Sequence, residues 1–120
     1  MSIRVMIVDD DPTVRVTLAR FFALHKDLKV VGEATNGRDG VELAQRVKAD
    51  VIVMDARMPE MNGLEATEQI RSLGINTPVL IFSAEDGVAG KINGLAKVGF
   101  LTKHGSGPRE TIAAIRELAS

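Results

Sequence analysis

One stretch, residues 51–63 (VIVMDARMPEMNG), constrains the fold of this chain more than any other. It opens with four apolar residues, which is the pattern of a strand buried on both faces. Asp55 stands where that strand should end, and Pro59 disfavours helix in the residue before it, so a loop follows. Asn62 and Glu65 then have the spacing of a capping box at the start of a helix. An acid at the carboxyl end of a buried strand lies where open α/β sheets bind their ligands.

Composition excludes several classes of protein. The 120 residues make one domain of ordinary hydrophobic content, 45%, with 26% charged residues. A net charge of −1 argues against general binding to nucleic acid or membrane surfaces, and 3% aromatic residues argue against base stacking. Cysteine is absent, which excludes disulfides and thiolate metal sites and is compatible with a reducing cytoplasm. No apolar run approaches the roughly 18 residues of a membrane span.

Along the whole chain, segments with strand patterns alternate with segments of helical periodicity. Strands are expected over residues 3–8, 28–34, 51–54, 78–82 and 99–102. A first helix is expected over residues 12–25, where Val14, Leu18, Phe21 and His25 recur at helical spacing. Further helices are expected over residues 62–73 and 86–96, around the apolar stripe Val41, Ala44 and Val47, and around the stripe Ile112, Ile115 and Leu118. The second strand is expected at an edge of the sheet because lysine and glutamate interrupt it.

Five strands that alternate with five helices predict a doubly wound α/β fold, with a parallel sheet covered on both faces. Right-handed crossovers leave a few strand orders, among them 2-1-3-4-5. Under that order Asp9, Asp10 and Asp55 meet at one edge of the sheet. Three carboxylates repel one another unless a cation joins them, and oxygen ligands with room for water suit Mg²⁺. Asp11, which precedes Pro12, is expected instead to cap the first helix.

Four motifs at these intervals together resemble one family, the receiver domains of two-component response regulators. They are VDDDP after the first strand, VIVMDARMPEMNG at the third, FSAE after the fourth and GFLTK at the fifth. The similarity covers essentially the whole chain, and it implies the flavodoxin-like receiver fold, five-stranded in the order 2-1-3-4-5, as a single domain over residues 1–120. The stretches LKVVGEATNG and DARMPEMNGLEA resemble the branch that carries a helix-turn-helix output domain. No output domain is expected within this chain.

The resemblance implies a role for each site residue. Asp55 would accept a phosphoryl group from a sensor histidine kinase, with Mg²⁺ as the cofactor. The implied metal ligands are Asp9, Asp10, Asp55 and the backbone carbonyl of Arg57. Ser83 would bind the phosphoryl group, Lys103 would pair with it, and Phe100 would be the switching aromatic residue.

The implied function is that of a phosphorylation-activated signalling switch in the cytoplasm. Apart from its own phosphorylation and dephosphorylation, such a domain is not an enzyme. Its output, expected to be transcription, would be controlled through the face of the fourth helix, fifth strand and fifth helix, which also allows a homodimer. DNA would be bound only by an output domain outside this chain, and no membrane is implied as a partner. In the fourth helix Gly87, Gly90 and Gly94 each disfavour helix by about 1 kcal/mol, so this segment is expected to carry the readout.

Two alternatives remain open at this point. Asp9, Asp11 and Thr13 spell DxDxT, which resembles the nucleophile motif of haloacid-dehalogenase-like Mg²⁺-dependent phosphatases. There Asp9 would attack the substrate and Asp11 would act as acid and base, and Asp55 would have no role. The other alternative is a degenerate receiver that binds partners without phosphorylation. It is suggested by the segment between the fourth and fifth strands, which is shorter than the family commonly has.

Overall fold

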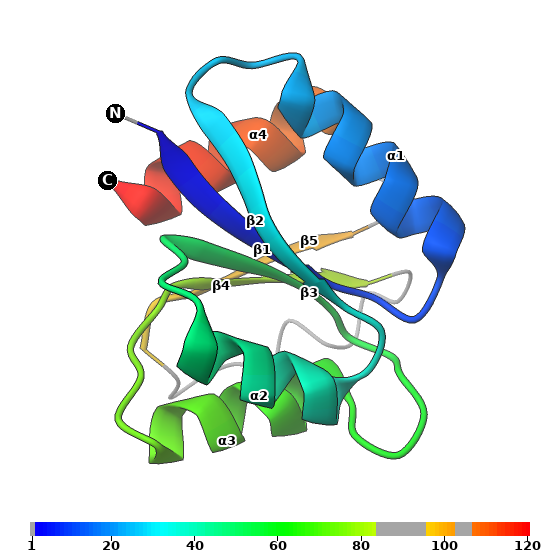
Figure 1. The fold of residues 1–120 in the computed structure, drawn as a ribbon, viewed down its shortest axis with the longest axis vertical. Coiled ribbons are helices and arrows are strands. Elements are labelled where there is room, and N and C mark those ends of the chain that lie inside the picture. The colour runs from blue at the N-terminus through cyan, green and yellow to red at the C-terminus, as the bar shows by residue number, and fades with distance from the viewer. Residues whose placement is uncertain (1, 84–95, 103–106) are drawn as a thin grey trace.

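A five-stranded parallel sheet forms the centre of the computed structural model, which describes residues 2–83, 96–102 and 107–120 (Figure 1). The strands are β1 (Ile3–Val8), β2 (Leu28–Ala34), β3 (Val51–Asp55), β4 (Val79–Ser83) and β5 (Val98–Thr102). Their order is β2-β1-β3-β4-β5 and each pair is parallel, which confirms the doubly wound fold. The helices within these residues are α1 (Pro12–Ala23), α2 (Gly37–Arg46), α3 (Gly63–Ser72) and α4 (Pro108–Ala119). The remaining expected helix, over residues 86–96, lies outside the described residues except for Ala96.

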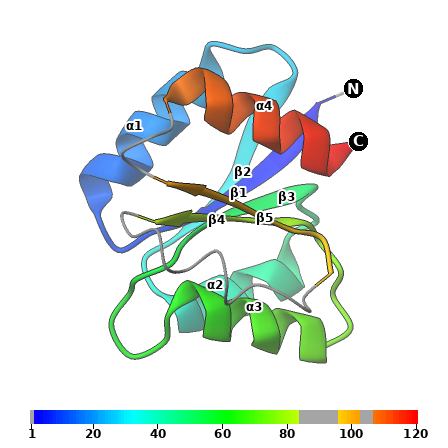
Figure 2. The same cartoon turned by 180° about the vertical axis from the view of Figure 1, so that it is seen from behind.

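The sheet separates two hydrophobic cores. Figure 1 and Figure 2 show α1 and α4 on one face of the sheet, and α2 and α3 on the other. Because side chains of a strand alternate between its two faces, successive residues of β1 join different cores. Met6 and Val8 share a core with Ile70 of α3, whereas Val5 and Ile7 share one with Phe22 of α1. Since helices cover both faces, residues 5–8 of β1 and 51–54 of β3 are unbroken apolar runs in place of alternating ones.

The helix starts follow the caps expected from the sequence. The Asp11 carboxylate accepts the backbone N–H of Thr13 at 2.9 Å, and Pro12 opens α1. Asn62 and Glu65 form the capping box of α3, with hydrogen bonds of 2.8 and 3.1 Å. These bonds satisfy N–H groups that the first turn of a helix leaves without a partner. The two caps therefore define the residues at which α1 and α3 begin.

A few boundaries differ from those expected. The first helix ends at Ala23 and not near residue 25, because the N–H groups of Leu24 and His25 bond three residues back, to Phe21 and Phe22. β4 begins and ends one residue later than predicted, and β5 begins one residue earlier. The most buried side chain of α1 is Phe22, which is 1% exposed, whereas Phe21 of the predicted stripe is half-buried. Among the described residues, every helix is too short or too polar to cross a lipid bilayer.

Candidate functional site

Three carboxylates meet at the carboxyl edge of the sheet, between β1 and β3. The register pairs Val8 with Met54, so the residue that follows β1, Asp9, lies level with the last residue of β3, Asp55. One carboxylate oxygen from each of Asp9, Asp10 and Asp55 lies within 4.8 Å of the others. The predicted convergence of these three acids is therefore confirmed, and it follows from the strand order.

Asp9 is held by several hydrogen bonds at once. Its backbone N–H donates to the carbonyl of Ala34 on β2 at 3.1 Å, which continues the ladder between β1 and β2 beyond the last residue of β1. Its carboxylate accepts the N–H of Asp11 at 2.9 Å, and its own carbonyl accepts Nη1 of Arg15 at 2.6 Å. The residue is 3% exposed, and burial of an ionised side chain is tolerated only with such partners. Strand β2 and helix α1 therefore hold the backbone of Asp9, and the N–H of Asp11 orients its carboxylate.

Asp55 ends β3 and is almost as buried, at 6% exposed. Its carboxylate accepts the backbone N–H of Arg57 at 3.3 Å. Gly63, the first residue of α3, packs against the carbonyl of Asp55 so closely that a Cβ would collide with it. The N–H of Gly63 donates to the carbonyl of Ala56 at 3.0 Å, and the N–H of Ala56 donates to Phe82 on β4 at 3.0 Å. Glycine thus allows α3 to begin directly against the strand end that carries Asp55.

The ligand chemistry of this group fits Mg²⁺. All three side chains are carboxylates, which are hard oxygen ligands, and the small magnesium ion is commonly bound by a few carboxylates and several waters. Asp9 and Asp55 are buried while Asp10 is exposed, so the group opens to solvent on one side. Asp11 is exposed, caps α1 and does not belong to the group. A cation there would also relieve the repulsion among three like charges.

Of the other predicted site residues, Ser83 lies at the same edge of the sheet, Phe100 lies in the middle of β5, and Lys103 lies outside the described residues. Ser83 ends β4 and is paired in register with Thr102, the last residue of β5. Phe100 lies in β5 opposite Ile81, half-buried against the core beneath α2 and α3. Lys103 follows Thr102 and falls outside the described residues. The side chain of Arg57 is exposed, whereas its backbone N–H contacts Asp55.

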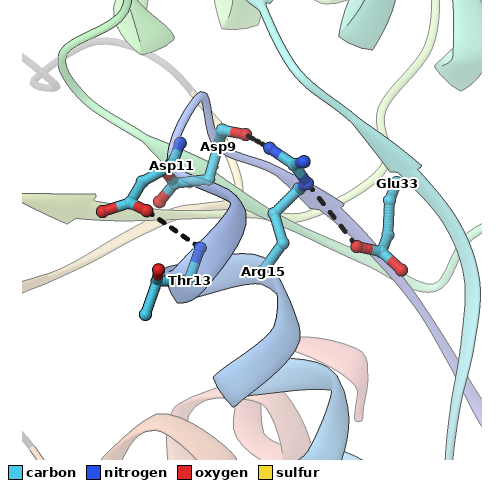
Figure 3. Close-up of polar contacts among 5 residues, drawn as sticks. All are labelled: Asp9, Asp11, Thr13, Arg15 and Glu33. Atoms are coloured by element: carbon cyan, nitrogen blue, oxygen red, sulfur yellow. Dashed lines mark hydrogen bonds and ion pairs between the residues drawn. The ribbon is translucent and has the colours of Figure 1, made fainter.

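Arg15 is the residue at this site that the sequence did not indicate. It lies in the first turns of α1, and its guanidinium reaches back from the helix to the carbonyl of Asp9 and toward Glu33 on β2 (Figure 3). In the sequence it is one of the two basic residues of this helix, and nothing in the helical pattern separates it from Arg20. Only its position could have indicated a role at the site, because it lies one turn into the helix that follows Asp9 and Asp10.

Comparison with known proteins gives one consistent result. The family model described as response regulator receiver domain matches residues 5–116. The response regulator GacA of Pseudomonas aeruginosa is 38% identical over 118 residues, which cover 97% of this chain and 55% of GacA. The nitrate/nitrite response regulator protein NarL of Escherichia coli K12 is 30% identical over 118 residues, 97% of this chain and 54% of NarL. A crystal structure of a LuxR-family two-component response regulator from Aurantimonas has a TM-score of 0.91 and 31% identity, covering 99% of this chain and 86% of that one.

The chain belongs to the family of response regulator receiver domains. It spans about half the length of the curated regulators that it matches, which are 54% and 55% covered. The resemblance seen in the four sequence motifs is thereby confirmed, and the likeness to a LuxR-family regulator agrees with the branch expected from the sequence.

Proposed function

We propose that this receiver is a phosphorylation-activated switch in which Asp55 accepts a phosphoryl group from a sensor histidine kinase. The observation that carries the proposal is the convergence of Asp9, Asp10 and Asp55 within 4.8 Å at the end of β3. Structural needs do not explain such a group, since the helix cap is supplied by Asp11 and like charges destabilise a fold. A cluster of acids in a receiver domain is explained by a cation and a phosphoryl group that share the site.

In the proposed reaction a carboxylate oxygen of Asp55 attacks the phosphorus atom of a phosphohistidine. A P–O bond forms to give an acyl phosphate, the P–N bond breaks, and the ring nitrogen keeps the electron pair. Phosphoryl transfer depends on in-line positioning and on charge neutralisation more than on further covalent chemistry. Burial of Asp55 and its hydrogen bond from the Arg57 N–H limit the directions in which its carboxylate can point.

The residues that would hold Mg²⁺ are Asp9, Asp10, Asp55 and the backbone carbonyl of Arg57. When bound, the ion supplies positive charge beside the oxygens of the transferred group. Lys103 is proposed to pair with the phosphoryl group as a compact charge, and Ser83 to donate a hydroxyl hydrogen bond to it. Support for these two roles comes from the strand ends, because Ser83 ends β4 and Lys103 directly follows the last residue of β5.

Output would be read from the face formed by residues 86–96, β5 and α4. Phe100 is the middle residue of β5 and is the proposed switching aromatic residue. The same face is also the proposed surface of a homodimer. The output itself is proposed to be transcription, exerted through a DNA-binding domain outside these residues.

The test is phosphorylation by a small donor. The chain is incubated with acetyl phosphate and Mg²⁺, and its intact mass is measured. One added phosphoryl group is expected in the wild type and in Asp11→Asn, and none in Asp55→Asn. A phosphatase that uses Asp9 and Asp11 would instead hydrolyse the donor and lose this activity in Asp11→Asn. Unmodified wild-type protein together with intact acetyl phosphate would indicate a degenerate receiver, and equal labelling of Asp55→Asn would place the acceptor elsewhere.

A further inference from the structure

We infer that Arg15 is a positioning residue for the metal and phosphoryl site, which sets where the Asp9 carboxylate stands. This inference rests on the proposed function, because it concerns the same site. Arg15 comes from α1, one turn after the acids, and its own N–H donates to the carbonyl of Asp11 at 3.1 Å. Its guanidinium therefore folds back over the loop between β1 and α1.

The contact with Asp9 is short and largely shielded from water. Nη1 of Arg15 donates to the Asp9 carbonyl at 2.6 Å, and the Arg15 side chain is 17% exposed. A hydrogen bond from a charged donor is shorter and stronger than one between neutral groups. The carbonyl belongs to the peptide that joins Asp9 to Asp10, so the bond acts on both acids of the pair. Rotation of that peptide would move the two carboxylates apart from Asp55.

Glu33 orients the guanidinium from the other side (Figure 3). Its carboxylate oxygen lies 3.7 Å from Nε of Arg15, and its backbone lies opposite Ile7 in the ladder of β1 and β2. Arg15 therefore spans from the edge strand to the acid pair. The Glu33 side chain is 44% exposed, so this ion pair is expected to contribute little by itself. The bond to Asp9 is the contact that matters for the site.

Charge and position predict opposite effects when Arg15 is replaced. A guanidinium beside three carboxylates repels a divalent cation, so loss of its charge alone should tighten Mg²⁺ binding. Loss of the hydrogen bond that orients Asp9 and Asp10 should weaken it, as removal of a residue that orients metal ligands generally does. The direction of the change in Arg15→Gln therefore separates the two roles.

The experiment is calorimetric titration of the chain with Mg²⁺, since the sequence has neither tryptophan nor tyrosine to report binding. Arg15→Gln is expected to raise the dissociation constant roughly tenfold with unchanged stoichiometry. Arg15→Lys keeps the charge and a hydrogen-bond donor but not the planar guanidinium, so its affinity for Mg²⁺ should fall less than that of Arg15→Gln. Arg20→Gln is the matched control, because it removes the same charge from an exposed position on the same helix, and Glu33→Gln should change little.

Rates with acetyl phosphate give a second readout. Arg15→Gln should need more Mg²⁺ to reach half its maximal rate and should recover most of the wild-type rate at saturation. A variant that is only partly folded would instead show reduced stoichiometry at an unchanged dissociation constant, which would overturn the inference. So would equal or tighter binding by Arg15→Gln. A wild-type chain that binds no Mg²⁺ would overturn the proposed function, and this inference with it.

Discussion

Aspartates at the two ends of the sheet have opposite surroundings. At the amino ends of the strands, Asp27 accepts two hydrogen bonds from the Arg116 guanidinium, at 2.9 and 3.0 Å. Asp50, at the same end, accepts the backbone N–H of Arg4 at 2.8 Å. At the carboxyl ends, one carboxylate oxygen from each of Asp9, Asp10 and Asp55 lies within 4.8 Å of the others.

The comparison shows how one residue type can serve either stability or function. The hydrogen bond from Arg116 lowers the pKa of Asp27, and the same bond raises the pKa of Arg116. The opposite charges of Asp27 and Arg116 neutralise each other, so the pair favours the folded chain without any ligand. The carboxylates of Asp9, Asp10 and Asp55 repel one another, and a cation at the proposed site would relieve that repulsion. A site of this kind lowers the stability of the ligand-free protein and makes its stability depend on the ligand.

The largest expected effect is that of Mg²⁺ on unfolding. At about 100 times its dissociation constant, Mg²⁺ should raise the free energy of unfolding by about 2.7 kcal/mol through mass action. Asp10→Ala should lose this increment and should leave the metal-free protein equally or more stable, because it removes one of three repelling charges. The measurement is chemical denaturation followed by circular dichroism, with and without Mg²⁺.

Asp27→Ala is the matched control for that experiment, since it removes an aspartate from the other end of the sheet. It should lower stability slightly and leave the increment from Mg²⁺ intact. An increment that persists in Asp10→Ala would show that the ion binds elsewhere.

Two glycines, one at each end of the sheet, extend the comparison, and their substitution should change the free energy of unfolding less than Mg²⁺ does. A Cβ at Gly63 would collide with the carbonyl of Asp55, so Gly63→Ala should lower the free energy of unfolding by about 2 kcal/mol, the cost of overpacking. Gly74 follows the carboxyl end of α3, near the amino ends of the strands. It has open space around it and a φ of 82°. Gly74→Ala should therefore lose about 1 kcal/mol, through backbone strain alone.

The two glycine variants should also differ in metal binding. Gly63→Ala displaces the strand end that carries Asp55, so its affinity for Mg²⁺ in calorimetric titration should fall. Gly74→Ala should bind Mg²⁺ as the wild type does. Equal affinity in both variants would mean that the contact between Gly63 and Asp55 has no part in shaping the site.

Features that depend on neighbours in the chain were predictable from the sequence. The capping box of Asn62 and Glu65 and the cap of Asp11 were expected because each involves residues two or three positions apart. The meeting of Asp9 with Asp55 was predictable as well, because parallel strands in a given order bring their carboxyl ends to one edge.

Contacts made by long side chains across the fold were not predictable. Arg15 reaches the carbonyl of Asp9, and Arg71 of α3 donates to the carbonyls of Ile75 and Ala96 at 3.0 to 3.2 Å. In the sequence both arginines look like solvated residues of a helix surface. Burial of Arg71 lowers its pKa, which is a consequence of tertiary structure alone. Phe22 was missed in favour of Phe21 for a similar reason, since adjacent aromatic residues fit the helical period almost equally well.

The smallest expected effect is that of acid on the pair at the amino end. Arg116 lowers the pKa of Asp27 from its ordinary value of 3.8, chiefly by hydrogen bonding, so the folded chain favours the ionised form. The stabilisation is therefore fully present above pH 3.8 and is lost as the pH falls through the lower folded pKa. The free energy of unfolding of Asp27→Asn should lie slightly below that of the wild type at neutral pH, and the two should converge in acid. The difference should also shrink in high salt, because both side chains are exposed to solvent. Urea titrations from pH 7 down to pH 2.5 measure it, and a difference that widens in acid would contradict the assigned sign.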